Sequence, residues 1–511
     1  MNRLPFTSSL FHLSSGLKII AFLLLLFIAT PRTNGQSIYY AELNKKEKSN
    51  LDFQIIGKSV DKLMIYKNID RKHVISYYNM MMNHLEDIEL DFIPEKTIKV
   101  DFIKCADSLI VVYSFEKNKH VICNAMIMKS KIQLIPSPIQ LDEAPIGMFA
   151  QSDIYTVVPS ENKQKFLLYK KQLRNNQADL LLKIYDIQIN LIDSFSISEN
   201  HDKQNDFYSE LIIDNDGNVA FAHQFRNRSI DNFDSLTLAV HFFQNKELMN
   251  FPIDLKNHYL EKSFLKADNI NHNLIVNAYY NSTKRGNAEG LFSAKLSLMN
   301  KKPIAAFNVL PKSFRSTITS SVDRGEIDNM DPKQILIKRN GAFVFIAEDS
   351  YTETLNNNNW NRNYNPVFSG TNDINFNNGY NINSNNTQNN SLHRYYCNNI
   401  VVAAVDSSLA LTWSNSITKR QMDADNDNYL SFTQLNQGKE INFIYLDRDN
   451  QRYVLSRQSI TPEGTPNRYP TIKSNEPQVE FMPRRSKQVG ANQLIIPFTY
   501  LNQIGFALID F

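Results

Sequence analysis

Three aspartates at alternate positions form the part of this sequence that is most similar to a metal-binding loop. Asp423, Asp425 and Asp427 follow one another with single residues between them, and carboxylates at this spacing open the loops that surround Ca²⁺ with oxygen ligands. The pattern is incomplete, because the twelfth position holds Gln434 where such loops carry a bidentate glutamate, and the sixth holds Asn428 in place of glycine. Ca²⁺ binding therefore competes with a solvated acidic turn, and these departures favour the turn.

Aromatic residues within an asparagine-rich stretch form a second candidate site. Trp360, Tyr364 and Tyr380 are spread through residues 352–395, where asparagine dominates. Rigid aromatic rings among polar groups can stack on a sugar or hold a partner protein. The stretch lacks the apolar residues needed to build a core of its own. The simpler interpretation, which we favour, is a disordered low-complexity insertion.

Two further charged groups offer only weak signs of catalysis. His84 lies close to Glu86 and Asp87, which is the composition expected of an exposed polar turn. Asp447 and Asp449 could act as the paired carboxylates of a carbohydrate-active site, but a charged β-turn has the same sequence. The chain contains no zinc-type histidine pair, glycine-rich phosphate loop or nucleophile elbow. No reaction can be assigned from these motifs.

The N-terminus predicts export. Lys18 precedes an apolar run of about 11 residues, and Pro31 and Gly35 then prevent a continuing helix. This run is shorter than the roughly 20 apolar residues of a membrane-spanning helix. We expect residues 1–36 to be a signal peptide. The mature chain would then lie in the periplasm, on the cell surface or outside the cell, without a membrane span.

Composition gives no sign of a nucleic-acid partner and argues against a disulfide framework. A formal charge of +3 on 511 residues gives no sign of a nucleic-acid-binding surface. Apolar residues make up 42% of the chain, which is enough for a large core. The three cysteines are too few for a disulfide framework. Cys105 and Cys123 could pair if oxidised, but we favour small buried apolar side chains.

The elements that must position these groups are β-strands. Apolar runs of about five to eight residues alternate with turns rich in Asn, Asp and Gly, and the pairs Asp216-Gly217 and Asn340-Gly341 are strong hairpin signals. The central runs, such as residues 109–113, are continuous, which indicates sheets covered on both faces. The second strand of each unit recurs with a period of about 50 residues once one insertion is removed. These strands begin near residues 62, 109, 166, 219, 274, 343, 442 and 494.

This period predicts a single β-propeller over residues 37–511, with eight four-stranded antiparallel blades. Seven blades is an alternative, and a two-domain β-sandwich is the structural runner-up. The last unit, residues 478–511, has only three strands, whereas residues 38–43 form a strand with no unit of its own. We therefore expect the N-terminal strand to complete the last blade and close the ring, which leaves no exposed sheet edge.

The chain resembles uncharacterised secreted propeller-like proteins of Bacteroidota. The resemblance lies in the signal peptide that ends near residues 34–36, and in paired strand phrases such as residues 274–280 with 290–298 and 400–406 with 411–419. It covers most of the mature chain. It implies a propeller fold and an exported location, and it implies no activity.

The connections predict which face of the propeller carries function. In a four-stranded blade, the turn between the second and third strands and the connection to the next blade lie on one face. The unusual segments, residues 311–332, 351–396, 422–428 and 461–477, are all connections of these two kinds. We therefore expect an exported, non-enzymatic binding or scaffolding module that presents loops on one face. Its partner would be an envelope or extracellular protein or a glycan. The alternative is a carbohydrate-active hydrolase or lyase with a site in the central funnel.

Overall fold

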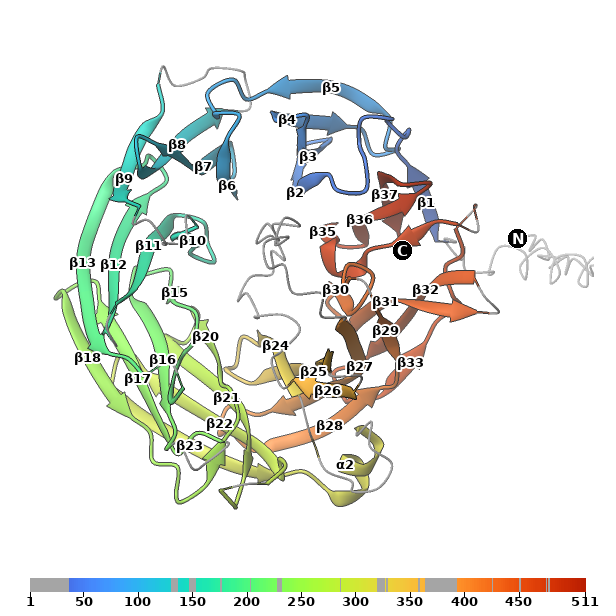
Figure 1. The fold of residues 1–511 in the computed structure, drawn as a ribbon. Helices are drawn as coiled ribbons and strands as arrows, with labels where there is room; N and C mark the ends of the chain where they lie inside the picture. Colours follow the sequence, from blue (N-terminus) through green and yellow to red (C-terminus); the bar gives the residue numbers. More distant parts are fainter. Residues whose placement is uncertain are drawn as a thin grey trace, which may run out of the picture.

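Eight antiparallel sheets are arranged as blades around a ring in the computed structural model (Figure 1). The structure describes residues 36–511 except 130–136, 147–152, 175–176, 203, 228–231, 285, 319–326, 328–329, 357–358, 364–392, 425, 450–451, 475 and 477. In each blade the strands A to D follow one another from the centre outwards. The predicted eight-bladed β-propeller is thus confirmed.

Blades 1 to 4 cover the first half of the ring. Their strands are β2 (Asp52–Ser59), β3 (Lys62–Ile69), β4 (Lys72–Tyr78) and β5 (His84–Glu89) in blade 1; β6 (Thr97–Lys104), β7 (Ser108–Lys117), β8 (His120–Lys129) and β9 (Ile139–Pro145) in blade 2; β10 (Tyr155–Pro159), β11 (Lys165–Arg174), β12 (Gln177–Asp186) and β13 (Leu191–Asn200) in blade 3; and β14 (Asp206–Tyr208) with β15 (Ile212–Ile213), β16 (Val219–Phe225), β17 (Ser235–Phe242) and β18 (Glu247–Pro252) in blade 4.

Blades 5 to 8 complete it. Their elements are β19 (Tyr259–Leu260) with β20 (Phe264–Asp268), β21 (Asn273–Asn281), β22 (Gly290–Ser297) and β23 (Lys302–Val309) in blade 5; β24 (Met330–Ile337), β25 (Phe343–Asn356), β27 (His393–Val405) and β28 (Leu411–Ile417) in blade 6, with β26 (Asn359–Asn363) on β25 and β29 (Gln421–Asp423) on β27; β30 (Phe432–Asn436), β31 (Ile441–Asp449), β32 (Arg452–Ile460) and β33 (Pro466–Arg468) in blade 7; and β34 (Glu480–Phe481), η1 (Pro483–Arg485), β35 (Lys487–Gly490), β36 (Gln493–Tyr500), β37 (Gln503–Asp510) and β1 (Ser37–Tyr40) in blade 8. The helix α2 (Lys312–Ile318) lies between blades 5 and 6.

The N-terminal strand closes the ring. β1 pairs antiparallel with β37, and Ser37 lies opposite Asp510. The main-chain N–H of Ala41 extends this ladder by donating to the carbonyl of Phe506 at 2.9 Å. The predicted closure is therefore confirmed, and β1 becomes the outer strand of blade 8.

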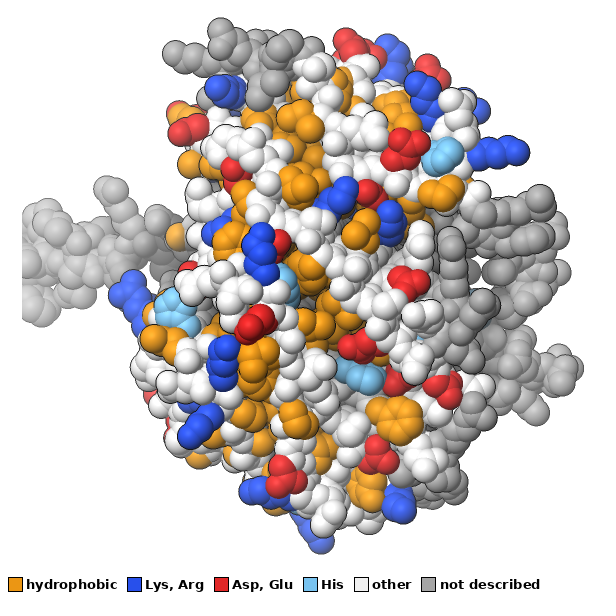
Figure 2. All heavy atoms as spheres, turned by 90° about the vertical axis from the view of Figure 1, so that its left-hand side faces the viewer, with side chains coloured by type: hydrophobic (Ala, Val, Ile, Leu, Met, Phe, Trp, Pro, Cys, Tyr) orange, Lys and Arg blue, Asp and Glu red, His pale blue; other side chains and the backbone are white. Residues whose placement is uncertain are grey.

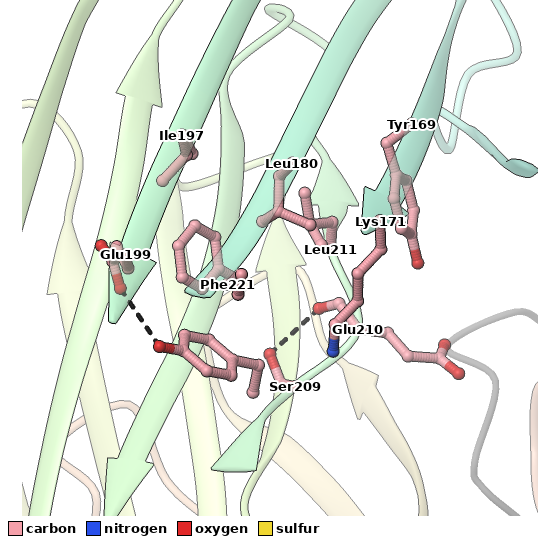
Figure 3. A pocket seen from close by; sticks show the side chains of 11 residues that line it. Tyr169, Lys171, Leu180, Ile197, Glu199, Ser209, Glu210, Leu211 and Phe221 are labelled. Carbon is pink, nitrogen blue, oxygen red and sulfur yellow. Dashed lines mark hydrogen bonds between the residues drawn. The ribbon is translucent and has the colours of Figure 1, made fainter. Parts of the chain in front are cut away.

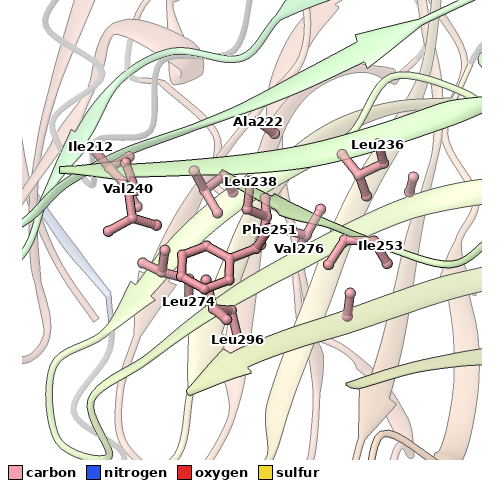
Figure 4. Packing of buried hydrophobic residues seen from close by; sticks show 14 of the residues in the cluster. Ile212, Ala222, Leu236, Leu238, Val240, Phe251, Ile253, Leu274, Val276 and Leu296 are labelled. Carbon is pink, nitrogen blue, oxygen red and sulfur yellow. The ribbon is translucent and has the colours of Figure 1, made fainter. Parts of the chain in front are cut away.

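The hydrophobic core lies between neighbouring blades. Figure 4 shows the contact between blades 4 and 5, where Leu238 and Val240 of β17 face Leu274 and Val276 of β21. Because both faces of a blade are covered in this way, β21 is buried along almost its whole length. This double burial explains why the second strands are continuous apolar runs.

Two faces of the ring differ in what they carry. We call the face with the B–C turns and the connections between blades the connection face, and the opposite one the turn face. Among the described residues, β26 extends a B–C connection, while α2 and β29 lie between blades. These additions fall on the connection face, as predicted. The prediction that residues 461–477 are wholly a connection between blades 7 and 8 was wrong. This segment contains the outer strand β33 and, before it, a turn on the turn face.

Asparagine side chains link neighbouring blades on the turn face. The main-chain N–H of Asn162 in blade 3 donates to Oδ1 of Asn215 in blade 4 at 3.0 Å. The N–H of Asn215 in turn donates to Oδ1 of Asn269 in blade 5 at 2.7 Å. Each asparagine therefore satisfies a main-chain group of the preceding turn, which holds three successive blades in register.

The outer rim is mixed in character. Figure 2 shows apolar side chains interspersed with charged ones over the outer strands. Exposed apolar residues include Leu191 on β13, Leu248 on β18 and Ile304 on β23, one from each outer strand. This distribution is normal for a protein surface and points to no particular partner.

Candidate functional site

A cavity of about 150 Å³ lies between blades 3 and 4, toward the connection face. Its position follows from the inner strand of blade 4, which is interrupted between β14 and β15. At the interruption, the Ser209 hydroxyl accepts a hydrogen bond from the main-chain N–H of Ala222 at 2.8 Å. The Ser209 N–H donates to the carbonyl of Ala222, also at 2.8 Å. The side chain therefore replaces part of the ladder at this point of the strand.

The floor of the cavity is apolar. Figure 3 shows that it is built from both blades, with Leu180 and Ile197 from blade 3 facing Leu211 and Phe221 from blade 4. All four side chains are buried, as is Ala178 beside them. A cavity of this volume lined by leucine, isoleucine and phenylalanine can hold a group the size of benzene.

The rim carries polar and charged groups: Tyr169, Lys171, Glu199, Tyr208, Ser209 and Glu210. Lys171 reaches solvent, but its surroundings still lower the pKa of the ammonium group through desolvation. Its Nζ lies 5.7 Å from the centre of the Tyr208 ring, a distance at which an aromatic face attracts a cation. Burial also raises the pKa of Tyr169, to about 12, so this phenol stays protonated at neutral pH.

Tyr208 is fixed in place from two sides. Its ring stacks on His223 with centroids 4.4 Å apart and planes 3° apart. Nε2 of His223 lies 2.8 Å from Oδ1 of Asp206, which orients the imidazole. The Tyr208 hydroxyl donates to Oε2 of Glu199 at 3.3 Å. The tyrosine is thus a rigid wall of the cavity rather than a mobile cover.

A buried charge network in blade 6 is the other chemical candidate. Glu348 lies 2.7 Å from Lys419 and accepts a hydrogen bond from Ser431. Lys333 lies 3.5 Å from Glu348 and 2.6 Å from Asp331. Burial raises the pKa of Asp331, whereas for Glu348 the two lysines outweigh burial and lower the pKa.

Opposite pKa shifts in neighbouring carboxylates are typical of acid–base pairs. However, Glu348 is 0% and Asp331 only 7% exposed, so no substrate can reach them. The network is balanced, with two lysines for two carboxylates. The network joins blade 6 to the segment leading into blade 7.

The predicted aspartate cluster is only partly described. Asp423 ends β29, Asp425 lies outside the described residues, and Asp427 pairs with Arg484 of blade 8 at 3.1 Å. Within the described part of the chain, no three His, Cys, Asp or Glu side chains gather closely enough to hold a metal ion. Ca²⁺ binding at this segment stays a prediction.

The predicted aromatic site also lies largely outside the described residues. Trp360 belongs to β26, where its backbone pairs with Leu355, and Tyr364 and Tyr380 fall in the segment that is not described. The structure therefore places one of the three on a hairpin extension of blade 6. Their predicted role in binding remains open.

The weak catalytic candidates lie on the outer strand of blade 1 and at the end of the second strand of blade 7. His84 and Asp87 pair at 2.8 Å on the outer strand β5, where Glu86 also pairs with Lys62. Asp447, near the B–C turn of blade 7, accepts a hydrogen bond from Ser456 of the next strand. Neither group lines a described cavity. The group on β5 is exposed, as the sequence interpretation expected, whereas Asp447 lies within a strand and not in the predicted turn.

The cavity itself was missed by sequence reasoning. Lys171, Glu199 and Tyr208 lie on three different strands and come together only when blade 4 packs against blade 3. The one local sign is the interruption of the strand pattern at Ser209 and Glu210, two polar residues between Tyr208 and Leu211.

A membrane-spanning helix is not found in the part of the chain that the structure describes, since no helix there has the necessary length and apolar character.

Comparisons with known proteins give likenesses of fold alone. No protein-family model matches the chain, and no curated protein matches it. The β-propeller domain of the Trilobed protease from Pyrococcus furiosus is 10% identical, with 84% of this chain and 97% of that chain covered and a TM-score of 0.35. An uncharacterized protein from Listeria monocytogenes is 8% identical, with coverages of 80% and 90% and a TM-score of 0.35. Prolyl oligopeptidase B from Galerina marginata is 10% identical with a TM-score of 0.39; the match covers 89% of this chain but 55% of the enzyme, so the chain spans about half its length.

Proposed function

We propose that this chain is an exported, non-enzymatic binding module that holds its ligand in the cavity between blades 3 and 4. The observation that carries the proposal is a concave apolar floor ringed by a few polar groups, which is the usual form of a ligand site. At about 150 Å³ it is smaller than the 300–1,000 Å³ or so of a drug-sized pocket. It therefore suits one side-chain-sized group of a partner or a small molecule.

Binding is favoured over catalysis because the groups best suited to acid–base chemistry, Asp331 and Glu348, are shut off from solvent. The exported location rests on residues 1–36 and on the resemblance to secreted propellers of Bacteroidota. In that location the partner would be an envelope or extracellular protein, or a ligand presented by one. A glycan would have to use the aromatic residues of the blade 6 insertion instead, since the cavity floor carries no polar groups.

The test uses benzene as a probe of the cavity in the mature chain, residues 37–511. Benzene at ten times its dissociation constant should raise the free energy of unfolding by about 1.4 kcal/mol. Ala178→Leu should fill the cavity and abolish this gain. Ala410→Leu, at an exposed turn, is the matched control and should keep it. Equal benzene stabilisation of the wild type and Ala178→Leu, with native circular dichroism in both, would contradict the proposal.

A further inference from the structure

The rim of the cavity carries opposite charges at its two ends. Figure 3 shows Lys171 and Glu199 on opposite sides of the opening, with Phe221 and Leu180 between them. Lys171 comes from the B strand of blade 3 and Glu199 from its D strand, and both lie near the ends that point to the connection face. A ligand that enters between them meets a cation on one side and an anion on the other.

The two charged groups have capacity to spare for a ligand. Among the described residues, no side chain accepts a hydrogen bond from the Lys171 ammonium or forms an ion pair with it. The ammonium group reaches solvent, so a carboxylate from a ligand can approach it and form a charge-assisted hydrogen bond. Glu199 accepts one hydrogen bond, from Tyr208, although a carboxylate has about four acceptor positions.

We propose that the cavity binds a free zwitterionic α-amino acid with an aromatic or branched apolar side chain. Lys171 would bind the carboxylate, Glu199 the ammonium group, and the apolar floor the side chain. This inference rests on the proposed function and specifies its ligand.

Charge complementarity selects this class over simpler ones. A monoanion would satisfy Lys171 but lie beside Glu199, with Glu210 on the same rim. A monocation would satisfy Glu199 but approach Lys171. A neutral hydrocarbon would fill the floor and leave both charges without a new partner. A molecule with both charges next to an apolar group offers each charged residue an opposite charge and fills the floor.

The experiment compares three probes of nearly equal shape by titration calorimetry on the mature chain. L-phenylalanine carries both charges, 3-phenylpropionate lacks the ammonium group, and phenethylamine lacks the carboxylate. Since a hydrogen-bonded charge contributes about a factor of ten in affinity, L-phenylalanine should bind at least about tenfold more tightly than either analogue.

Variants then assign each charge to its residue. Lys171→Met should remove the preference for L-phenylalanine over phenethylamine and keep the preference over 3-phenylpropionate. Glu199→Gln should do the reverse. Lys302→Met, at an exposed position of β23, is the matched control and should keep both preferences. Circular dichroism and the urea midpoint confirm that each variant is folded.

The outcomes separate this inference from the proposed function. If either analogue binds as tightly as L-phenylalanine, the zwitterion proposal is overturned, while benzene binding to the cavity still supports a binding role. If the preferences survive in Lys171→Met and Glu199→Gln, the assignment of these residues is wrong. If neither benzene nor L-phenylalanine binds, both proposals fail together.

Discussion

Removing the carboxylate of Glu47 should destabilise the junction at which the ring closes. Glu47 Oε1 lies 2.6 Å from Lys67 Nζ, and the two side chains are only 7% and 1% exposed. The Lys67 ammonium also donates to the Tyr78 hydroxyl at 2.6 Å and lies 5.2 Å from the Phe506 ring of β37. The carbonyl of Glu47 accepts the N–H of Ile504. This pair therefore connects blade 1 to blade 8.

Glu47→Gln keeps the shape and leaves the lysine charge buried without its counter-ion. Breaking a buried pair in this way costs about 3–5 kcal/mol. Replacing both partners, in Glu47→Leu with Lys67→Met, should cost much less, because no uncompensated charge remains. The free energies come from urea unfolding of the mature chain, followed by circular dichroism.

The chain offers an internal control for this prediction. Lys62 and Glu86 form an ion pair with the same 2.6 Å separation in the same blade, but their side chains are 48% and 44% exposed. Glu86→Gln should therefore cost less than about 1 kcal/mol. The reasoning is refuted if Glu47→Gln is as mild as Glu86→Gln, or if the double variant loses the sum of the two single losses.

Three other predictions concern a glycine, an aspartate and the cysteines. Gly464 has φ +89°, and a Cβ there would lie 2.6 Å from Trp413. Gly464→Ala should therefore lower the free energy of unfolding by about 1–3 kcal/mol and shift the fluorescence of Trp413, measured in a Trp360→Phe background. Unchanged emission would contradict the prediction. For Asp142, burial works to raise the pKa, but hydrogen bonds from Lys170, Lys183 and Tyr155 outweigh it and hold the pKa below 3.8. The contribution of Asp142 to the free energy of unfolding is therefore complete above pH 3.8 and is lost as pH falls through the folded-state pKa. Asp142→Asn should be less stable than the wild type by about 1–3 kcal/mol at neutral pH, and this difference should shrink in acid. A difference that stays constant with pH would contradict the prediction. The three thiols, Cys105, Cys123 and Cys397, are free and buried, and burial raises the pKa of each; a thiol-reactive disulfide should modify them only after unfolding, and rapid labelling of any one in the native chain would disprove this.

Much of the fold could be predicted because a propeller repeats its pattern. The second strand of each blade is apolar on both faces, and the structure starts these strands at Lys62, Ser108, Lys165, Val219, Asn273, Phe343, Ile441 and Gln493, each at or next to its predicted position. Outer strands were harder to locate, because they pack on one side only. β33, for example, is three exposed residues, 466–468, with no apolar pattern.

The candidate site could not be predicted because its chemistry arises from contact between blades. Lys171 lies between Lys170 and Gln172, and Glu199 between Ser198 and Asn200, so neither differs from the polar residues around it. Tyr208 gains its role by stacking on His223 of another strand. The asparagines show the same limitation. Nothing in the sequence distinguishes Asn215 and Asn269 from the many other asparagines, yet each completes a hydrogen bond with the preceding blade.

The pairing of β1 with β37 also sets a schedule for folding. At roughly 5–20 residues per second, synthesis of the stretch that separates these strands takes on the order of 25–95 s. During that time β1 has no strand to pair with, and each newly synthesised blade exposes a sheet edge to other chains. The ring can therefore close only after β37 has been synthesised. In a chain that stalls before Gln503, β1 would stay unpaired and the ring open. A protease could then cleave the open ring in preference to the closed one.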